Sequence, residues 1–215
     1  MSDRLRGLAG RPDVLIVGLP RGGVPVAFEV ARALRVPLET FVVRKLGVPG
    51  HEELAMGAIA SGGITVIERD VVDQLGIPSA VVDRVARAEH RELERREVLY
   101  RGNRPYPELH GRTVVVVDDG LATGATMAAA VAALRELGPS KIIVAVPMGS
   151  TAACAALDRL ADECVCLAMP EPFYGVGMWY HDFAQTTDDE VRWLLAEAKE
   201  EEGNDVGTPA HAGAS

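Results

Sequence analysis

Positive charge is scarce in this sequence. Its 215 residues carry 22 Lys and Arg against 31 Asp and Glu, which gives a formal net charge of −9. Nucleic acids and anionic membranes bind through basic surfaces, so neither is expected as a main partner. A small basic pocket remains compatible with this charge.

Cysteine and long apolar runs are scarce as well. The three Cys are an odd number without metal-ligand spacing, and Cys164 and Cys166 lie in a strand-like segment where core packing is the expected role. No apolar run approaches the roughly 20 residues that span a bilayer, and the opening segment does not resemble a signal peptide. We therefore expect a cytoplasmic protein with reduced thiols and no membrane contact.

Short runs of β-branched residues alternate with segments of helical periodicity. The runs are almost continuously apolar, as strands of a parallel sheet covered on both faces must be. Strands are expected at 14–18, 38–43, 113–117, 141–146 and 164–168, with a weaker candidate at 63–67. Helices are expected at 24–34, 127–137, 151–162 and 188–199. The alternation predicts an α/β fold, with a doubly wound, mainly parallel five-stranded sheet flanked by helices.

Two segments break the alternation. Residues 44–62 lack clean periodicity and are expected to form a long loop with at most one helical turn. Residues 79–101 predict a long, highly charged helix whose charges mostly face solvent. We expect one domain over 1–199, with its core at about 13–168 and a hood or flap at about 169–199. The remainder, 200–215, is acidic and Gly-rich, and predicts a disordered tail.

The stretch "TVVVVDDGLATGATM" at 113–127 carries the clearest signal of a binding site. Its loop, Gly120–Thr126, follows a buried strand and leads directly into a helix. Gly120 and Gly124 let the chain curl so that successive amides converge on an anion, and Thr123 and Thr126 add hydroxyl donors. A phosphate is the natural ligand of such a helix start. The loop matches neither a Walker A loop nor the dinucleotide GxGxxG pattern.

Asp118 and Asp119 precede this loop and need a role compatible with a nearby phosphate. Carboxylates placed against the phosphate itself would repel it, whereas they can accept hydrogen bonds from vicinal hydroxyls one sugar away. A ribose 5-phosphate satisfies both halves of the stretch. A receiver-like acidic pocket and a plain βα turn are the alternatives, although a receiver would carry its paired acids after the first strand.

The residues "VVVVDDGLATGAT" resemble the phosphoribosyl pyrophosphate (PRPP) binding motif of the type I phosphoribosyltransferases. The resemblance covers roughly 13–168 and implies a strand order of 2-1-3-4-5. It implies that the 5-phosphate is held by Gly120, Leu121, Ala122, Thr123, Gly124, Ala125 and Thr126. One departure is Gly120, because a larger apolar residue is common there in the family. Another is the short segment before the first strand.

A second glycine-rich loop, "LPRGGVPVA", follows the first strand. Arg21 supplies a fixed positive charge whose fork suits two phosphate oxygens, and the resemblance implies a pyrophosphate loop of Arg21, Gly22 and Gly23. In the implied order, strands one and three are neighbours, so both loops flank one crevice. Arg44 and Lys45 end the expected second strand, where they would either meet the diphosphate or face solvent.

Two further segments carry hypotheses about the acceptor side. Residues 44–62 would form a mobile lid, in which His51 acts as an acid or base or merely lines the lid. Half of the few aromatics gather in "FYGVGMWYHDF" at 173–183, where Tyr174, Trp179 and Tyr180 would stack on a flat acceptor. Packing of a C-terminal flap or a dimer contact explains these aromatics equally well.

The resemblance implies transfer of a 5-phosphoribosyl group from PRPP to a nucleobase or related amine, with release of pyrophosphate, a reaction of nucleotide metabolism. Asp118, Asp119 and Arg21 would be catalytic, and Mg²⁺ would enter with PRPP, near both acids through ribose hydroxyls or water. The partners would be PRPP and a small-molecule acceptor, with a homodimer left open. A non-catalytic PRPP-binding regulator, a phosphohydrolase and a nucleotide-binding scaffold without chemistry remain as alternatives.

Overall fold

A five-stranded parallel sheet forms the centre of the molecule, in the order β2-β1-β6-β7-β8. The computed structural model describes residues 1–206, except for the side chains of 52, 53 and 203–206. The strands of this sheet are β1 (Val14–Gly18), β2 (Leu38–Thr40), β6 (Thr113–Val117), β7 (Lys141–Met148) and β8 (Glu163–Ala168). Counted within this sheet, the order is the predicted 2-1-3-4-5, so the fold class is confirmed.

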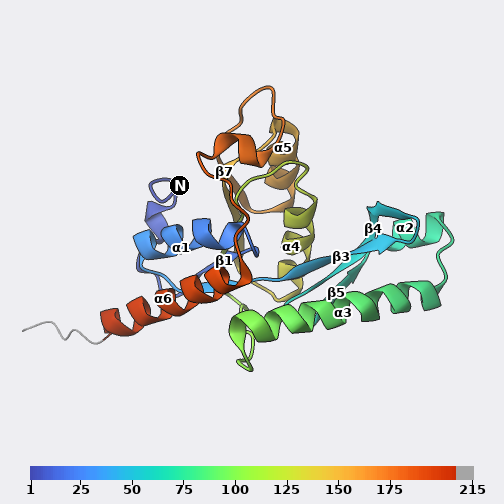
Figure 1. The fold of residues 1–215 in the computed structure, drawn as a ribbon, viewed down its shortest axis with the longest axis horizontal. Coiled ribbons are helices and arrows are strands. Elements are labelled where there is room, and N and C mark those ends of the chain that lie inside the picture. Colours follow the sequence, from blue (N-terminus) through green and yellow to red (C-terminus); the bar gives the residue numbers. More distant parts are fainter. Residues whose placement is uncertain (207–215) are drawn as a thin grey trace, which may run out of the picture.

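Helices cover both faces of this sheet because its central strands are apolar on both sides (Figure 1). Alternate residues of β1 point to opposite cores: Ile16 packs with the helices of one face, and Val17 packs with those of the other. The first face carries α1 (Gly23–Leu34) and α6 (Asp188–Val206). The second face carries α4 (Ala125–Glu136) and α5 (Thr151–Leu160).

A second, antiparallel sheet stands where a loop was expected over 44–62. It consists of β3 (Val43–Val48), β4 (His51–Ala60) and β5 (Ile64–Ile67), in that order. The loop prediction is therefore wrong, while the weak strand at 63–67 exists as β5. The pairing of β3 with β4 shifts register on both sides of Gly47, and such an irregularity removes the strict alternation by which a strand is recognised.

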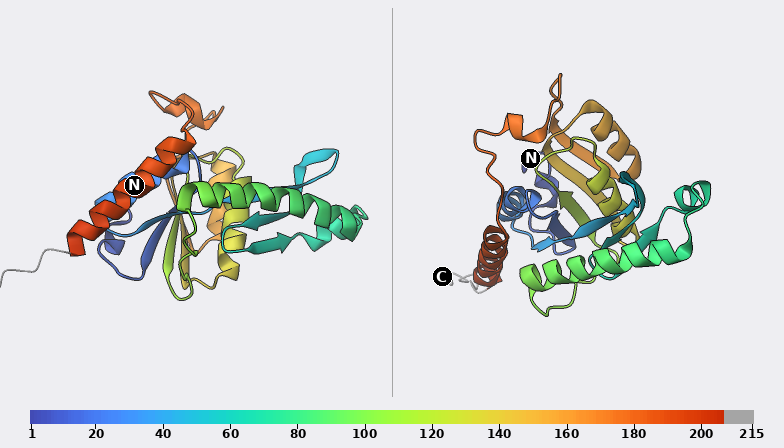
Figure 2. Two further views of the ribbon diagram at one scale, coloured as in Figure 1. Left: turned by 60° about the horizontal axis from the view of Figure 1, so that its bottom comes forward. Right: turned by 45° about the vertical axis from the view of Figure 1, so that its right-hand side comes forward.

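The charged helix predicted over 79–101 is α3 (Ser79–Arg101), preceded by the short α2 (Arg69–Gln74). Both views in Figure 2 show α3 lying along the three-stranded sheet. Its contact side holds buried Leu93, with Val82, Val85 and Ala86 packed against the same core cluster. The narrow apolar side of α3 thus covers one face of the second sheet, and α4 packs on the other.

The C-terminal part of the chain departs from expectation in its extent. Helix α6 continues to Val206 instead of ending near 199, which corrects the tail predicted from residue 200. Residues 207–215 of that predicted tail lie outside the described part. Two short 3₁₀ turns complete the fold, η1 (Arg6–Leu8) and η2 (Val176–Trp179), the second within the hood. Among the described residues, every helix is too short or too polar to cross a membrane.

Leu93 should anchor α3 on the second sheet. It is 1% exposed, so Leu93→Ala leaves a cavity and should lower the free energy of unfolding by about 2–5 kcal/mol in urea denaturation. Leu75→Ala is the matched control, because Leu75 is 51% exposed and its truncation should change that free energy by less than about 1 kcal/mol. Equal losses in the two variants would show that α3 does not cover a core.

Candidate functional site

The loops after β1 and β6 meet at the carboxyl edge of the main sheet. The two strands are parallel neighbours, with Gly18 opposite Val117, so both loops start side by side. The N–H of Leu19 donates to the carbonyl of Val117 at 2.9 Å, and the Pro20–Arg21 peptide is cis. A Cβ on Gly23 would lie 2.6 Å from the Val117 carbonyl oxygen. Only a glycine at this position lets the two loops approach so closely.

The loop after β6 presents backbone donors at the start of α4. Within the described part of the chain, no acceptor pairs with the N–H groups of Ala122, Thr123, Gly124 and Thr126. Gly124 has φ +76°, and the Thr123 hydroxyl accepts from the N–H of Ala125 at 3.3 Å. Unpaired amides and the positive end of the α4 macrodipole together form an anion cradle.

Neighbouring residues hold this cradle in place from the other side. The N–H of Leu121 donates to the Met148 carbonyl at 3.0 Å. Ser150 donates twice to the cradle: its N–H to the Leu121 carbonyl and its hydroxyl to the Ala122 carbonyl, both at 2.8 Å. The carbonyl groups of Leu121 and Ala122 are therefore occupied, while the N–H groups of 122–124 and 126 stay unpaired within the described part of the chain.

The two acids sit between the loops. The Oδ1 of Asp118 accepts from the N–H of Asp119 at 2.9 Å. Burial, and then the neighbouring Asp119 carboxylate, raises the pKa of Asp118 to about 7, while burial also raises the pKa of Asp119. The pair is therefore costly to ionise without a nearby positive charge, and a ligand that brings cationic character would favour ionisation.

A cleft of about 620 Å³ lies against these loops. It is lined by Arg21, Gly22, Pro25, Val26, Asp119, Tyr180, Asp182, Phe183, Ala184, Gln185, Thr186 and Glu190. The hood and the start of α6 thus supply one part of the lining, and the loop after β1, the first turn of α1 and Asp119 supply the other; residues 120–126 do not belong to it. The Tyr180 hydroxyl joins the two parts by donating to the Asp119 carbonyl at 2.8 Å, and burial raises its pKa to about 12.

Arg21 reaches the cleft from the loop after β1. Its Nη1 lies 3.9 Å from Oδ1 of Asp188, the first residue of α6. That same oxygen accepts a hydrogen bond from the Tyr100 hydroxyl at 2.5 Å. The partly exposed contact between Arg21 and Asp188 is weak, so the guanidinium can turn to a ligand at low cost.

Other residues chosen from the sequence lie elsewhere. The second strand ends at Thr40, so the expectation that Arg44 and Lys45 end it is wrong: both lie in β3. Arg44 donates to Glu89 of α3 through Nε at 2.7 Å. His51 is exposed at the start of β4, in a sheet and not in a loop lid.

The hood aromatics divide between the cleft and the surface. Tyr180 lines the cleft, whereas Tyr174 is 77% exposed and Trp179 49% exposed, and neither belongs to the lining. The sequence argument missed Gln185 and Glu190 as lining residues, because polar residues without a motif carry no signal of their own. It also missed Val176: a Cβ on Gly120 would lie 2.8 Å from that side chain.

Comparisons with known proteins agree with this architecture. The family model of the phosphoribosyl transferase domain matches residues 1–178, and the chain belongs to that family. The protein TT1426 of Thermus thermophilus is 40% identical, with a TM-score of 0.82 over 91% of this chain and 92% of that one.

Curated relatives point the same way. A provisionally named phosphoribosyl transferase of Mycobacterium tuberculosis is 48% identical over 198 residues, which are 92% of this chain and 44% of that protein. The bifunctional protein PyrR of Roseiflexus sp. is 32% identical over 139 residues, 64% of this chain and 57% of that protein. The chain therefore spans less than half the length of its Mycobacterium relative.

Gly23→Ala should separate the two loops. The added Cβ would meet the backbone at Val117 and Asp118, which cannot yield as a side chain can, so the free energy of unfolding should fall by about 1–3 kcal/mol. In Gly7→Ala, the control, the Cβ meets nothing within 4 Å, so no loss is expected. If urea denaturation finds both variants as stable as the parent, the loops are not in contact.

Asp118→Asn should change how stability depends on pH. The folded protein holds the Asp118 proton up to about pH 7, whereas an unfolded Asp releases it near about pH 4, so the parent should lose stability as pH rises between these values. The variant lacks this loss and should be more stable than the parent at pH 8, by about 1 kcal/mol or more, and no more stable at pH 4.

Urea denaturation at both pH values measures this difference. Asp83→Asn on the exposed side of α3 serves as the control, because it removes the same charge without burial. A pH-independent difference between Asp118→Asn and the parent would contradict the raised pKa.

Proposed function

We propose that this chain transfers a 5-phosphoribosyl group from PRPP to an acceptor and releases pyrophosphate. The contact between the loop of Arg21 and the loop of Asp118 is the observation that carries the proposal. It brings an anion cradle, a carboxylate pair and a guanidinium to one edge of the sheet. These are the groups that a sugar with a phosphate at one end and a diphosphate at the other requires.

Each group takes one part of the donor. The amides of residues 122–126 hold the 5-phosphate, and Asp118 and Asp119 accept hydrogen bonds from the ribose 2- and 3-hydroxyls. As the C1–O bond lengthens, the ring gains positive charge, which ionised carboxylates on its hydroxyls stabilise. Arg21 binds the diphosphate and stabilises its charge as it leaves, after turning away from Asp188.

The carboxylate pair also suits a magnesium ion that arrives with the donor. No group of three or more His, Cys, Asp or Glu side chains forms a metal cage among the described residues. Mg²⁺ commonly binds through one or two carboxylates together with substrate oxygens, and Asp118 and Asp119 offer that number. The ion would neutralise charge on the diphosphate, and its positive charge would offset the cost of ionising Asp118.

The acceptor would enter the cleft from the hood side. Tyr180 and Phe183 form a tilted aromatic pair with ring centroids 5.2 Å apart, and both line the cleft. A flat nucleobase or related amine can pack on such rings while Asp119 lies across the cleft. Tyr174 and Trp179 stay predictions for acceptor binding, since the hood would have to move for either to reach the cleft.

A pyrophosphate-release assay with PRPP, Mg²⁺ and a panel of nucleobases and amines tests the proposal. We expect release with at least one acceptor, and a fall of about 100-fold or more in Asp118→Asn plus Asp119→Asn, because the ribose loses its ionised partners. Asp70→Asn plus Asp73→Asn on exposed α2 removes the same charge and should leave release unchanged.

The other outcomes assign the remaining functions. PRPP that raises the melting temperature without pyrophosphate release would make the chain a PRPP-binding regulator. Orthophosphate in place of pyrophosphate would indicate a phosphohydrolase. A melting temperature that PRPP and Mg²⁺ leave unchanged would reduce the site to a scaffold.

A further inference from the structure

A second pocket lies outside the cleft, between the C-terminal end of α3 and helix α6. Its volume is about 700 Å³. It is lined by Val98, Leu99, Tyr100, Gly102, Arg104, Asp189, Arg192, Trp193, Leu195, Ala196 and Lys199. None of these residues lines the cleft between the two loops. The two loop motifs of the candidate site therefore do not indicate a function for this pocket.

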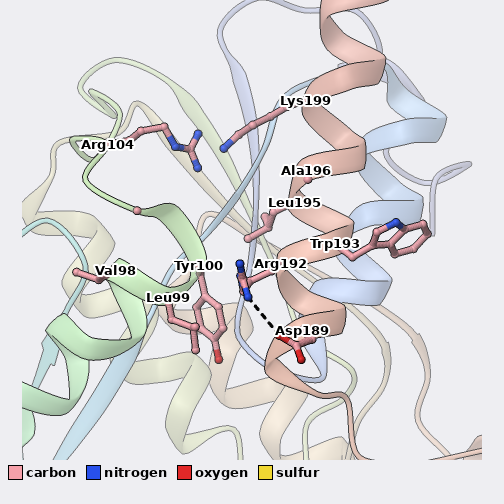
Figure 3. A pocket seen from close by; sticks show the side chains of 11 residues that line it. Val98, Leu99, Tyr100, Arg104, Asp189, Arg192, Trp193, Leu195, Ala196 and Lys199 are labelled. Atoms are coloured by element: carbon pink, nitrogen blue, oxygen red, sulfur yellow. Dashed lines mark hydrogen bonds and ion pairs between the residues drawn. The ribbon is translucent and has the colours of Figure 1, made fainter.

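The lining of this pocket is basic in a chain whose net charge is −9. It contains Arg104, Arg192 and Lys199, and Asp189 is its one carboxylate. Asp189 pairs with Arg192 at 3.3 Å. Figure 3 shows Arg104 and Lys199 pointing toward one another across the pocket.

Neither Arg104 nor Lys199 has an acidic partner in the described part of the chain. Arg104 donates through Nε to the Arg101 carbonyl at 2.9 Å, which orients the guanidinium while leaving its two terminal nitrogens available. Like charges that converge in this way repel one another, and an anion between them reverses the sign of the interaction. An arginine fork and a lysine ammonium together suit a phosphate group.

The rest of the lining is partly apolar. It includes Leu99, Leu195 and Ala196, and also Val98, which is 59% exposed. A ligand for this pocket therefore combines an anionic group with a flat apolar body. An acidic macromolecule fits less well, since it would bring many charges against a chain of net charge −9.

We propose that this pocket binds a phosphate-bearing small molecule with a flat apolar body, such as a nucleoside monophosphate. Arg104 and Lys199 hold its phosphate, Arg192 adds a third positive charge, and its ring packs on the exposed Val98 and Ala196. The site is separate from the cleft, so the proposal stands whether or not the chain transfers phosphoribosyl groups.

Trp193 supplies a local reporter of binding. The chain has two Trp, so Trp179→Phe leaves Trp193 in the pocket lining as the sole tryptophan. Titration of this variant with adenosine monophosphate should change the Trp193 fluorescence saturably. The midpoint should rise at least about tenfold when Arg104→Gln and Lys199→Gln are added, because two charged donors are lost.

Matched variants separate this pocket from other effects. Arg69→Gln plus Arg159→Gln removes the same charge from exposed positions on α2 and α5 and should leave the midpoint unchanged. Arg21→Gln should also leave it unchanged, because Arg21 belongs to the cleft. Inorganic phosphate should bind more weakly than the nucleotide, and adenosine, which lacks the anion, should bind more weakly still.

Four results would overturn the proposal. They are no saturable change in fluorescence, a midpoint that Arg104→Gln plus Lys199→Gln leaves unchanged, an equal response to adenosine and its monophosphate, and equal affinity for inorganic phosphate and the nucleotide. A Trp193 signal that depends on protein concentration without any phosphate would assign the pocket to a second copy of the chain instead.

Discussion

The close approach of the loop after β1 to the end of β6 is the contact on which the site depends. It exists because β1 and β6 are parallel neighbours and because Gly22 and Gly23 carry no Cβ. A Cβ on Gly22 would lie 2.8 Å from Cγ of Asp119, and one on Gly23 would lie 2.8 Å from Cα of Asp118. The missing side chains let the loop of Arg21 lie against both Asp118 and Asp119, and Arg21 and Asp119 line the same cleft. Without that approach, the unpaired amides at the start of α4 would have no arginine loop beside them.

Ionising the two carboxyl groups at this edge of the sheet carries an electrostatic cost. Asp118 is held where ionisation is unfavourable, and the nearest cation in the cleft, Arg21, faces Asp188 instead. The hydroxyl of Tyr100 in α3 donates to Asp188, the first residue of α6. Helices α3 and α6 therefore both help to set the position of Arg21. Ionisation of Asp118 is therefore favoured only when positive charge comes close to it.

The main sheet was predictable because its strands are apolar on both faces. The motif after β6 was predictable because glycine and threonine between a strand and a helix are typical of an anion-binding loop. The second sheet was not. A register shift around Gly47 breaks the alternation of apolar and polar residues in this sheet. The sequence therefore predicts a loop over 44–62, and it predicts Arg44 at the end of the second strand instead of in β3. The ion pair of Arg44 with Glu89 depends on α3 packing across that sheet, which no local pattern reports.

Gly120 shows how the loop after β6 is connected to the hood. A Cβ at this position would lie 2.8 Å from the side chain of Val176 in the hood. Tyr180 of the same hood donates to the carbonyl of Asp119. Two adjacent residues therefore support the hood directly, Gly120 by lacking a side chain and Asp119 through its backbone carbonyl. A displacement of residues 119–120 would therefore disturb the contacts of Val176 and Tyr180 in the hood.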